Sequence, residues 1–168
     1  MTKDLIETIF SRRSIRKYTD EPVSDDDIKT MLEAAMAAPS ASNSQPWHFV
    51  VVMERATLDA LAEAHPHGKM LAQATLCIAV CGDPAISDYW QQDCSAAIEN
   101  LLLAVAALGL GAVWLSAYPR EKRVALARRI LSIPENIVPV NLISIGHPAE
   151  TKEPRTQYNE ARVHRGRW

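Results

Sequence analysis

Residues 11–52 read SRRSIRKYTDEPVSDDDIKTMLEAAMAAPSASNSQPWHFVVV, and this run predicts a basic turn, a helix, a polar loop and a strand in succession. Ser24 followed by three aspartates is a helix N-cap with an acidic first turn, which the helix dipole favours. The helix ends before Pro39, and the small polar residues up to Pro46 form a loop. The aromatic and β-branched residues of 47–53 predict a strand. A polar loop therefore connects this helix directly to a strand.

The remaining elements follow from the same criteria, applied outward from this run. The predicted helices cover residues 3–10, 55–64, 88–108 and 119–131, and the predicted strands cover 75–81, 112–116 and 138–145. Because helices and strands mix without strict alternation, we expect an α+β fold with a central sheet packed between helices. The length of 168 residues fits a single domain, residues 1–168.

The predicted helix over 88–108 carries apolar residues around nearly its whole circumference. A helix that is apolar all round must be buried on all sides. One small subunit cannot easily provide that cover, so we expect a homodimer. We also expect the arginine-rich tail, residues 155–168, to be docked, and the partner subunit is one surface that could receive it.

The overall charge argues against a general nucleic-acid or anionic-membrane binder. Such proteins usually show a strong basic excess, whereas this chain has a net charge of −2 and a pI of about 6.2. No apolar signal segment opens the chain and no apolar run reaches transmembrane length. We therefore expect a cytoplasmic protein that binds neither nucleic acid nor membrane.

The three cysteines are expected to be reduced core thiols. Cys77 and Cys81 fall in one predicted strand, about 13 Å apart along it, which is too far for a disulfide. The alternative is a redox or metal role, but no C-x-x-C motif is present.

The most suggestive basic feature is Arg12-Arg13-Ser14-Ile15-Arg16. Arginine presents a planar fork that matches phosphate oxygens, and the Ser14 hydroxyl adds a small donor. Three arginines just after a helix can converge on one dianion. Taken alone, such a cluster is more typical of a solvated basic turn.

The loop between Pro39 and Pro46 offers a second set of ligand groups. Ser40, Asn43 and Gln45 present neutral donors and acceptors, which suit the imide edge and ribityl hydroxyls of a flavin. The alternative is an ordinary polar loop between a helix and a strand.

Two further stretches could contribute charge or close backbone approach. Lys69, just before a predicted strand, could stabilise an anionic reduced flavin, or be a plain exposed lysine. After the last predicted strand, Gly146 and His147 could bring backbone close to a ligand, and Arg155 could bind phosphate. The alternative there is a C-terminal turn with stray charge.

Several other chemistries lack their motifs. The chain has no G-x-x-x-x-G-K-[ST], H-E-x-x-H or G-x-S-x-G motif, and its histidines do not pair at metal-ligand spacing. Gly109-Leu110-Gly111 follows a helix and lacks a third glycine, so it is not a dinucleotide fingerprint. An enzyme with this sequence would rely on an organic cofactor.

Together these motifs resemble those of the FMN-dependent nitroreductases. R-R-S-x-R-x-Y, A-P-S-x-x-N-x-Q-P-W and I-G-x-P-A-E stand in that family's order and approximate spacing, and the resemblance covers essentially the whole chain. It implies a nitroreductase-like fold with a central, mostly antiparallel sheet, in an intertwined homodimer that binds FMN at the subunit interface.

The resemblance also implies roles for individual residues. Arg12, Arg13, Ser14 and Arg16 would bind the phosphate and the pyrimidine side, helped by Lys69 and Arg155. Pro39, Ser40, Asn43 and Gln45 would approach the ring from the other subunit. The backbone of Leu115, Ser116 and Ala117 would lie near the flavin N5, and Gly146 and His147 near the phosphate.

The expected activity is that of an NAD(P)H-dependent oxidoreductase, which reduces nitroaromatics, quinones or similar small acceptors by a ping-pong two-electron mechanism. The flavin would carry the chemistry, so no catalytic side chain is expected. The alternatives are a same-fold enzyme of different reaction (flavin-consuming or dehydrogenating), a non-enzymatic FMN carrier, and a phosphopeptide or nucleic-acid patch formed by the arginines.

Overall fold

The helices and strands expected from the sequence are all present in a computed structural model, which describes residues 4–168. Residue 3, the first of the helix expected over 3–10, lies outside the described residues. The elements are α1 (Leu5–Ser11), α2 (Asp25–Met36), η1 (Ala41–Asn43), β1 (Trp47–Val52), α3 (Arg55–Ala64), η2 (Lys69–Ala72), β2 (Leu76–Gly82), α4 (Trp90–Ala107), β3 (Gly111–Ser116), α5 (Glu121–Leu131), β4 (Val138–Gly146) and η3 (Glu160–Arg162).

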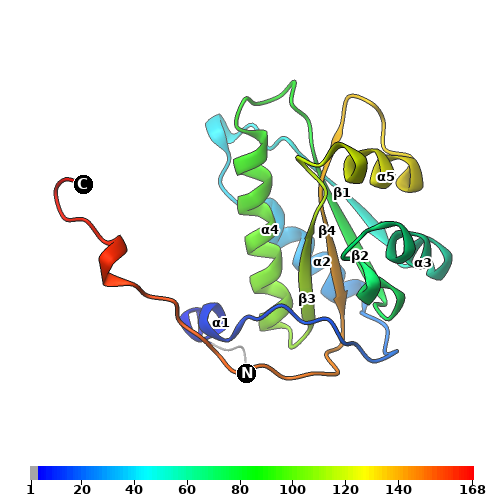
Figure 1. Ribbon diagram of the computed structural model, residues 1–168, viewed down its shortest axis with the longest axis horizontal. Helices are drawn as coiled ribbons and strands as arrows, with labels where there is room; N and C mark the ends of the chain where they lie inside the picture. Colours follow the sequence, from blue (N-terminus) through cyan, green and yellow to red (C-terminus); the bar gives the residue numbers. More distant parts are fainter. Residues whose placement is uncertain (1–3) are drawn as a thin grey trace.

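The four strands form one sheet in the order β1-β2-β4-β3, and every neighbouring pair is antiparallel. One apolar cluster joins α2 and α4 to one face of the sheet, and a second joins α3 and α5 to the other. Figure 1 shows these two helical layers on either side of the strands. The expected α+β fold, with an antiparallel sheet packed between helices, is confirmed.

The start of α2 has the predicted cap. The backbone N–H of Asp27 donates to the Ser24 hydroxyl oxygen at 3.1 Å, and three aspartates occupy the first turn. A serine cap of this kind contributes on the order of 1 kcal/mol. It fixes where α2 begins and therefore where the following polar loop leaves the helix.

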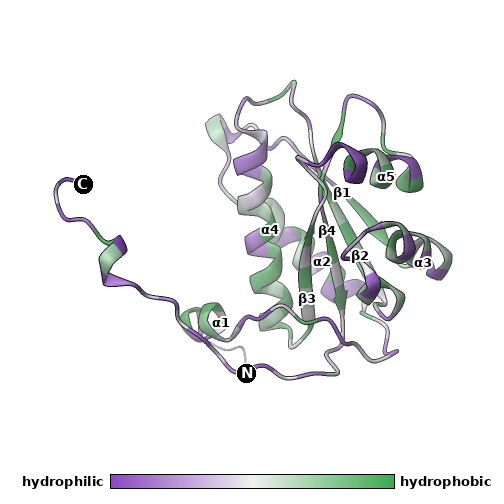
Figure 2. Cartoon of the chain, viewed as in Figure 1, coloured by the Kyte–Doolittle hydropathy of each residue, from purple (hydrophilic) through white to green (hydrophobic). Residues whose placement is uncertain are grey.

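Helix α4 is buried on one side only within this chain. Cys94, Ile98 and Leu101 pack into the core, whereas Leu103, Ala104 and Ala107 border a groove that Leu5 of α1 also lines. Helix α1 exposes further apolar side chains, namely Leu5, Ile6, Ile9 and Phe10. Figure 2 shows the apolar colouring of α1 and of the adjoining part of α4.

The segment after α1 docks beside β3, which is an edge strand of the sheet. The Ile15 N–H donates to the Ala112 carbonyl at 2.9 Å, and Ser14 forms a parallel bridge with Ala112. Gly111 makes this docking possible, because a Cβ there would lie 2.7 Å from the Ile15 Cγ2 atom. The sheet edge thus holds the arginine run in place.

All three cysteines are buried free thiols, as expected. Burial raises the pKa of Cys77, Cys81 and Cys94 to about 12, so the thiols stay protonated. No group of three potential metal ligands occurs among residues 4–168. None of the helices described is long and apolar enough to cross a membrane.

The C-terminal tail does not pack on the body of its own chain. After β4 the chain passes α1, where the Arg155 N–H donates to the Phe10 carbonyl, and it then extends away from the sheet (Figure 1). Residues 156–168 are exposed. The surface on which this tail docks stays a prediction.

Candidate functional site

Two hollows lie along the outer edge of β3, one at each end of the strand. The first, here called the arginine pocket, has a volume of about 150 Å³ and is lined by Ser11, Arg12, Arg13, Ile15, Leu102, Val105, Ala106, Gly109, Leu110, Ala112 and Lys152. The second, here called the Ser116 pocket, has a volume of about 310 Å³ and is lined by Arg16, His65, His67, Trp114, Leu115, Ser116 and Arg123. The docked arginine run therefore contributes to both hollows.

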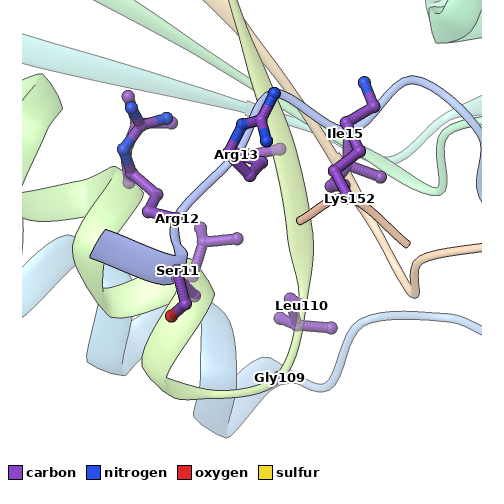
Figure 3. A pocket seen from close by; sticks show the side chains of 11 residues that line it. Ser11, Arg12, Arg13, Ile15, Gly109, Leu110 and Lys152 are labelled. Carbon is purple, nitrogen blue, oxygen red and sulfur yellow. The ribbon is translucent and has the colours of Figure 1, made fainter. Parts of the chain in front are cut away.

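The arginine pocket collects cations from two distant parts of the sequence. Arg12 and Arg13 come from the segment after α1, and Lys152 comes from the segment after β4 (Figure 3). Arg12 lies 3.6 Å from the Glu99 carboxylate, and Arg13 donates to the Glu153 carbonyl. Lys152 donates to the Ser14 carbonyl. Three cations in one small hollow favour an anionic ligand such as phosphate.

Glu150 ties the segment after β4 to the arginine run. Its carboxylate accepts the Arg16 backbone N–H at 2.6 Å and lies 3.3 Å from the Lys152 ammonium. The Arg16 N–H, followed by Lys152, lowers the pKa of Glu150 below its ordinary value. Through this contact, the position of Lys152 depends on the position of Arg16.

Backbone donors of the open sheet edge face the Ser116 pocket, and within residues 4–168 they have no backbone partner on that side. In the antiparallel ladder of β3 with β4, the Ala117 N–H donates to the Val140 carbonyl. Backbone groups alternate in direction along such a strand, so the N–H groups of Trp114 and Ser116 point to the open edge. A flat ligand with acceptor atoms along one edge can pair with them.

Two side chains hold the backbone of Ser116 from α3 and α5. His65 Nε2 lies 3.1 Å from the Ser116 carbonyl oxygen, and the Arg123 guanidinium donates to that oxygen and to the Ser116 hydroxyl, both at 3.2 Å. The His67 N–H donates to His65 Nδ1. His65 is 2% exposed, and burial lowers its pKa below the ordinary 6.5, so it is neutral near pH 7 with its proton on Nε2.

The polar loop after α2 carries backbone strain. Ser42, Asn43 and Gln45 have φ angles of 53°, 54° and 50°, in the left-handed region that non-glycine residues rarely adopt. Strain of this kind clusters at functional sites. The loop is fixed at Ala41, whose N–H donates to Asp93 in the first turn of α4 at 3.0 Å.

This loop and the arginine run lie at opposite ends of α4 (Figure 1). Arg12 contacts Glu99 and the arginine pocket reaches Gly109, whereas the loop contacts Asp93. Within one chain, therefore, Pro39, Ser40, Asn43 and Gln45 do not meet the arginines. Their contribution to a site on another subunit stays a prediction.

The structure explains Gly146 by packing within the chain. A Cβ at Gly146 would lie 3.0 Å from the Tyr18 ring, so packing alone already requires a glycine here. The approach of its backbone to a ligand stays a prediction. His147 faces Glu21 at 3.7 Å between Nδ1 and the carboxylate. Neither residue lines either of the two hollows.

The other predicted residues divide between the hollows and the surface. Leu115 is buried and Ser116 exposed in the Ser116 pocket, and Ala117 is buried next to it. Lys69 in η2 and Arg155 in the tail are both exposed and line neither hollow.

Four residues of the site were not singled out from the sequence. Lys152 lies three positions before Arg155, so its place after the last strand was an available signal. Glu150 stood in the I-G-x-P-A-E motif but had no assigned role. His65 and Arg123 contact Ser116 across 51 and 7 positions in sequence, and no local pattern marks either contact.

Comparison with known proteins gives one family for the chain. The model of the nitroreductase family matches residues 9–72 and 63–147. A protein of Archaeoglobus fulgidus, provisionally named NADH dehydrogenase/NAD(P)H nitroreductase, is 49% identical over 173 residues, which cover 99% of each chain.

Solved structures agree over the whole length. A Bacteroides thetaiotaomicron protein with the same provisional name has a TM-score of 0.96 and 45% identity, with 100% of each chain covered. A provisionally named nitroreductase of Desulfovibrio desulfuricans, solved in complex with FMN, has a TM-score of 0.82 and 33% identity over 98% of each chain. The chain belongs to the nitroreductase family.

Proposed function

We propose that this protein is an FMN-dependent oxidoreductase that uses NAD(P)H to reduce nitroaromatics, quinones or similar small acceptors by a ping-pong two-electron mechanism. The observation that carries the proposal is the edge of β3. Cations gather at its start, around Ala112, and the backbone N–H groups of Trp114 and Ser116 point to the open edge at its end. FMN has the matching order of groups, with a phosphate at one end and a ring bearing acceptor atoms at the other.

The residues present fit that cofactor. Arg12, Arg13 and Lys152 would hold the phosphate, because all three cations line one small hollow. Arg16 and the Ser116 N–H would face the ring, since both border the second hollow. When bound, the flavin would accept a hydride from the nicotinamide and pass two electrons to the acceptor. The Desulfovibrio relative solved with FMN supports this choice.

The chain's own side chains would bind and position rather than exchange protons. His65 and Arg123 hold the Ser116 carbonyl from two helices, which fixes the last peptide of β3 at the pocket. A site preorganised in this way needs no reorganisation when charge develops on a bound ring.

We further propose that residues 1–168 act as one domain whose site is completed by a second copy. The apolar face of α1 and α4 needs cover, and the strained loop with Pro39, Ser40, Asn43 and Gln45 lies far from the arginines of its own chain. In a homodimer, that loop would reach the ring bound by the partner subunit. The exposed tail would wrap the same partner.

The proposal is tested on freshly purified protein by its visible spectrum, the mass of any bound ligand, and NAD(P)H oxidation with a nitroaromatic or quinone. We expect a yellow protein that releases FMN and turns over with both acceptors. Tight FMN without turnover would favour a carrier, and consumption of FMN would favour a different reaction. A colourless protein that takes up no FMN would contradict the proposal.

A further inference from the structure

A third hollow, here called the basic groove, opens beside the Ser116 pocket. It lies between the end of α3 and the start of α5, has a volume of about 730 Å³, and is lined by Ala64, Pro66, Pro119, Arg120, Glu121, Lys122, Arg123 and Leu126. Arg123 lines both this groove and the Ser116 pocket. The two hollows therefore adjoin at this side chain.

The groove carries a positive charge that the protein does not neutralise. Arg120, Lys122 and Arg123 face a single acid, Glu121. Among residues 4–168, neither Arg120 nor Lys122 forms an ion pair. Arg128 of the same helix differs, because it pairs with Glu135 and donates to the Ile137 carbonyl. Arg120 and Lys122, at the start of α5, therefore line the groove without an acidic partner among residues 4–168.

The remaining walls of the groove are apolar. Pro66 and Pro119 come from the two segments that flank it, and Leu126 comes from α5. Apolar surface beside free guanidinium groups suits a ligand that combines a flat ring with anionic groups, because arginine both stacks on rings and binds phosphate oxygens.

We propose that the basic groove binds the phosphate-bearing adenosine half of the reduced pyridine nucleotide, while the nicotinamide half reaches the exposed face of the flavin ring bound at the Ser116 pocket. This inference rests on the proposed function, in which the pyridine nucleotide is the polyanionic substrate. Arg120 and Lys122 are specificity-determining residues that contact its phosphates. The arginine pocket is a separate site, because it lies at the other end of β3 and shares no residue with the groove.

The test uses the FMN-loaded protein and the variants Arg120→Gln and Lys122→Gln, with Arg129→Gln as the control. Arg129 is exposed on the same helix but does not line the groove, so the control removes the same charge elsewhere. The readouts are KM for NADPH and for NADH, and the Kd of adenosine 2′,5′-bisphosphate and of ADP-ribose by calorimetry. Flavin content and the visible spectrum check that each variant keeps its cofactor.

We expect each groove variant to raise the nucleotide KM and Kd about five- to tenfold, with kcat and flavin content unchanged, as for loss of one charged contact. A larger change for NADPH and for the bisphosphate places the 2′-phosphate in the groove. If the values for NADH and ADP-ribose change as much as those for NADPH and the bisphosphate, the groove binds the pyrophosphate. Unchanged KM and Kd values, or equal losses in Arg129→Gln, would overturn the inference.

The same experiment separates this inference from the proposed function. If the wild type does not bind FMN and does not turn over NAD(P)H, the proposed function is contradicted. Calorimetry still measures the affinity of the groove for the two adenosine nucleotides in that case. If the wild type turns over NAD(P)H but the groove variants have unchanged KM and Kd values, only the inference about the groove is contradicted. A wild type that binds neither adenosine nucleotide also overturns the groove.

Discussion

The imidazole of His65 donates from Nε2 to the carbonyl oxygen of Ser116 across 3.1 Å, joining the end of α3 to the last residue of β3. The other ring nitrogen accepts the His67 N–H, so both nitrogens are used by the neutral ring. A second proton on Nδ1 would break the contact with His67 and place a charge in a buried position. The conformation of the site edge therefore depends on His65 staying neutral.

Stability should rise with pH through the range in which a free histidine loses its proton. Because the pKa of His65 is lowered from 6.5 in the folded state, the unfolded chain binds more protons below that pH. The contribution of neutral His65 to the free energy of unfolding is complete above pH 6.5 and is lost as pH falls toward the folded-state pKa. Urea titrations of wild type and His65→Gln at several pH values measure it.

His65→Gln keeps a donor for Ser116 but does not titrate. At about pH 8 we expect it to cost about 1–2 kcal/mol, the scale of an imperfectly replaced buried hydrogen bond. At about pH 5 the difference from wild type should shrink. A constant difference across this range would show that His65 does not carry the pH dependence.

The two hollows predict different ligand profiles for the arginines. Arg13→Ala and Lys152→Ala should weaken FMN binding about tenfold or more and leave riboflavin binding nearly unchanged, because they would remove phosphate contacts. Arg16 borders the Ser116 pocket, so Arg16→Ala should weaken both ligands alike. Fluorescence titration of the apoprotein with FMN and riboflavin measures the ratios. Equal loss of both ligands in Arg13→Ala would place that side chain at the ring.

The predicted dimer can be tested on the exposed face of α4. Ala106 lines the arginine pocket, so a charge there would disturb the anion site as well as an interface. Ala107 is exposed and does not line the arginine pocket. It borders the separate groove that Leu5 of α1 also lines. Ala107→Glu should give monomers that retain little flavin, by analytical ultracentrifugation and absorbance. Ala125→Glu, exposed on α5 across the sheet, is the matched control and should stay dimeric. A flavin-loaded Ala107→Glu monomer would refute the shared site.

The thiols should be unreactive in the folded protein. Burial raises the pKa of each of Cys77, Cys81 and Cys94 to about 12, and the thiolate is the reactive form. We expect a chromogenic disulfide reagent at about pH 8 to detect no thiol in the native protein and all 3 in denaturant. Rapid labelling of one thiol before unfolding would revive the redox alternative.

The fold was largely predictable because its signals are local. The Ser24 cap, the proline boundaries and the β-branched strands each act within a few residues, and the observed bounds differ from the expected ones by at most two positions for most elements. Helix α4 leaves apolar surface uncovered within the chain, and its cover by a second subunit stays a prediction.

The site was only partly predictable because its contacts are long-range. Arginine chemistry pointed to Arg12 and Arg13, but the split of the run between two hollows depends on the Ile15 to Ala112 hydrogen bond. The sequence predicts that Gly146 brings backbone close to a ligand, and the Tyr18 ring, which lies where its Cβ would point, is a second reason for a glycine. Packing and ligand approach impose the same demand for glycine, so sequence cannot separate them.

The strained loop gives a last prediction, at Ser42. Its φ of 53° and ψ of 26° lie in the left-handed region, which glycine adopts without the Cβ clash. Ser42→Gly should therefore raise the free energy of unfolding by about 1 kcal/mol, and Ser42→Val should lower it by more than that. If the strain holds Asn43 and Gln45 ready for a ring on the partner subunit, Ser42→Gly should also weaken FMN binding, because the freed loop must be ordered on binding. Thermal unfolding of the apoprotein and FMN titration measure the two effects separately. A variant that is more stable and binds FMN as tightly as wild type would show that the strain has no role in the site.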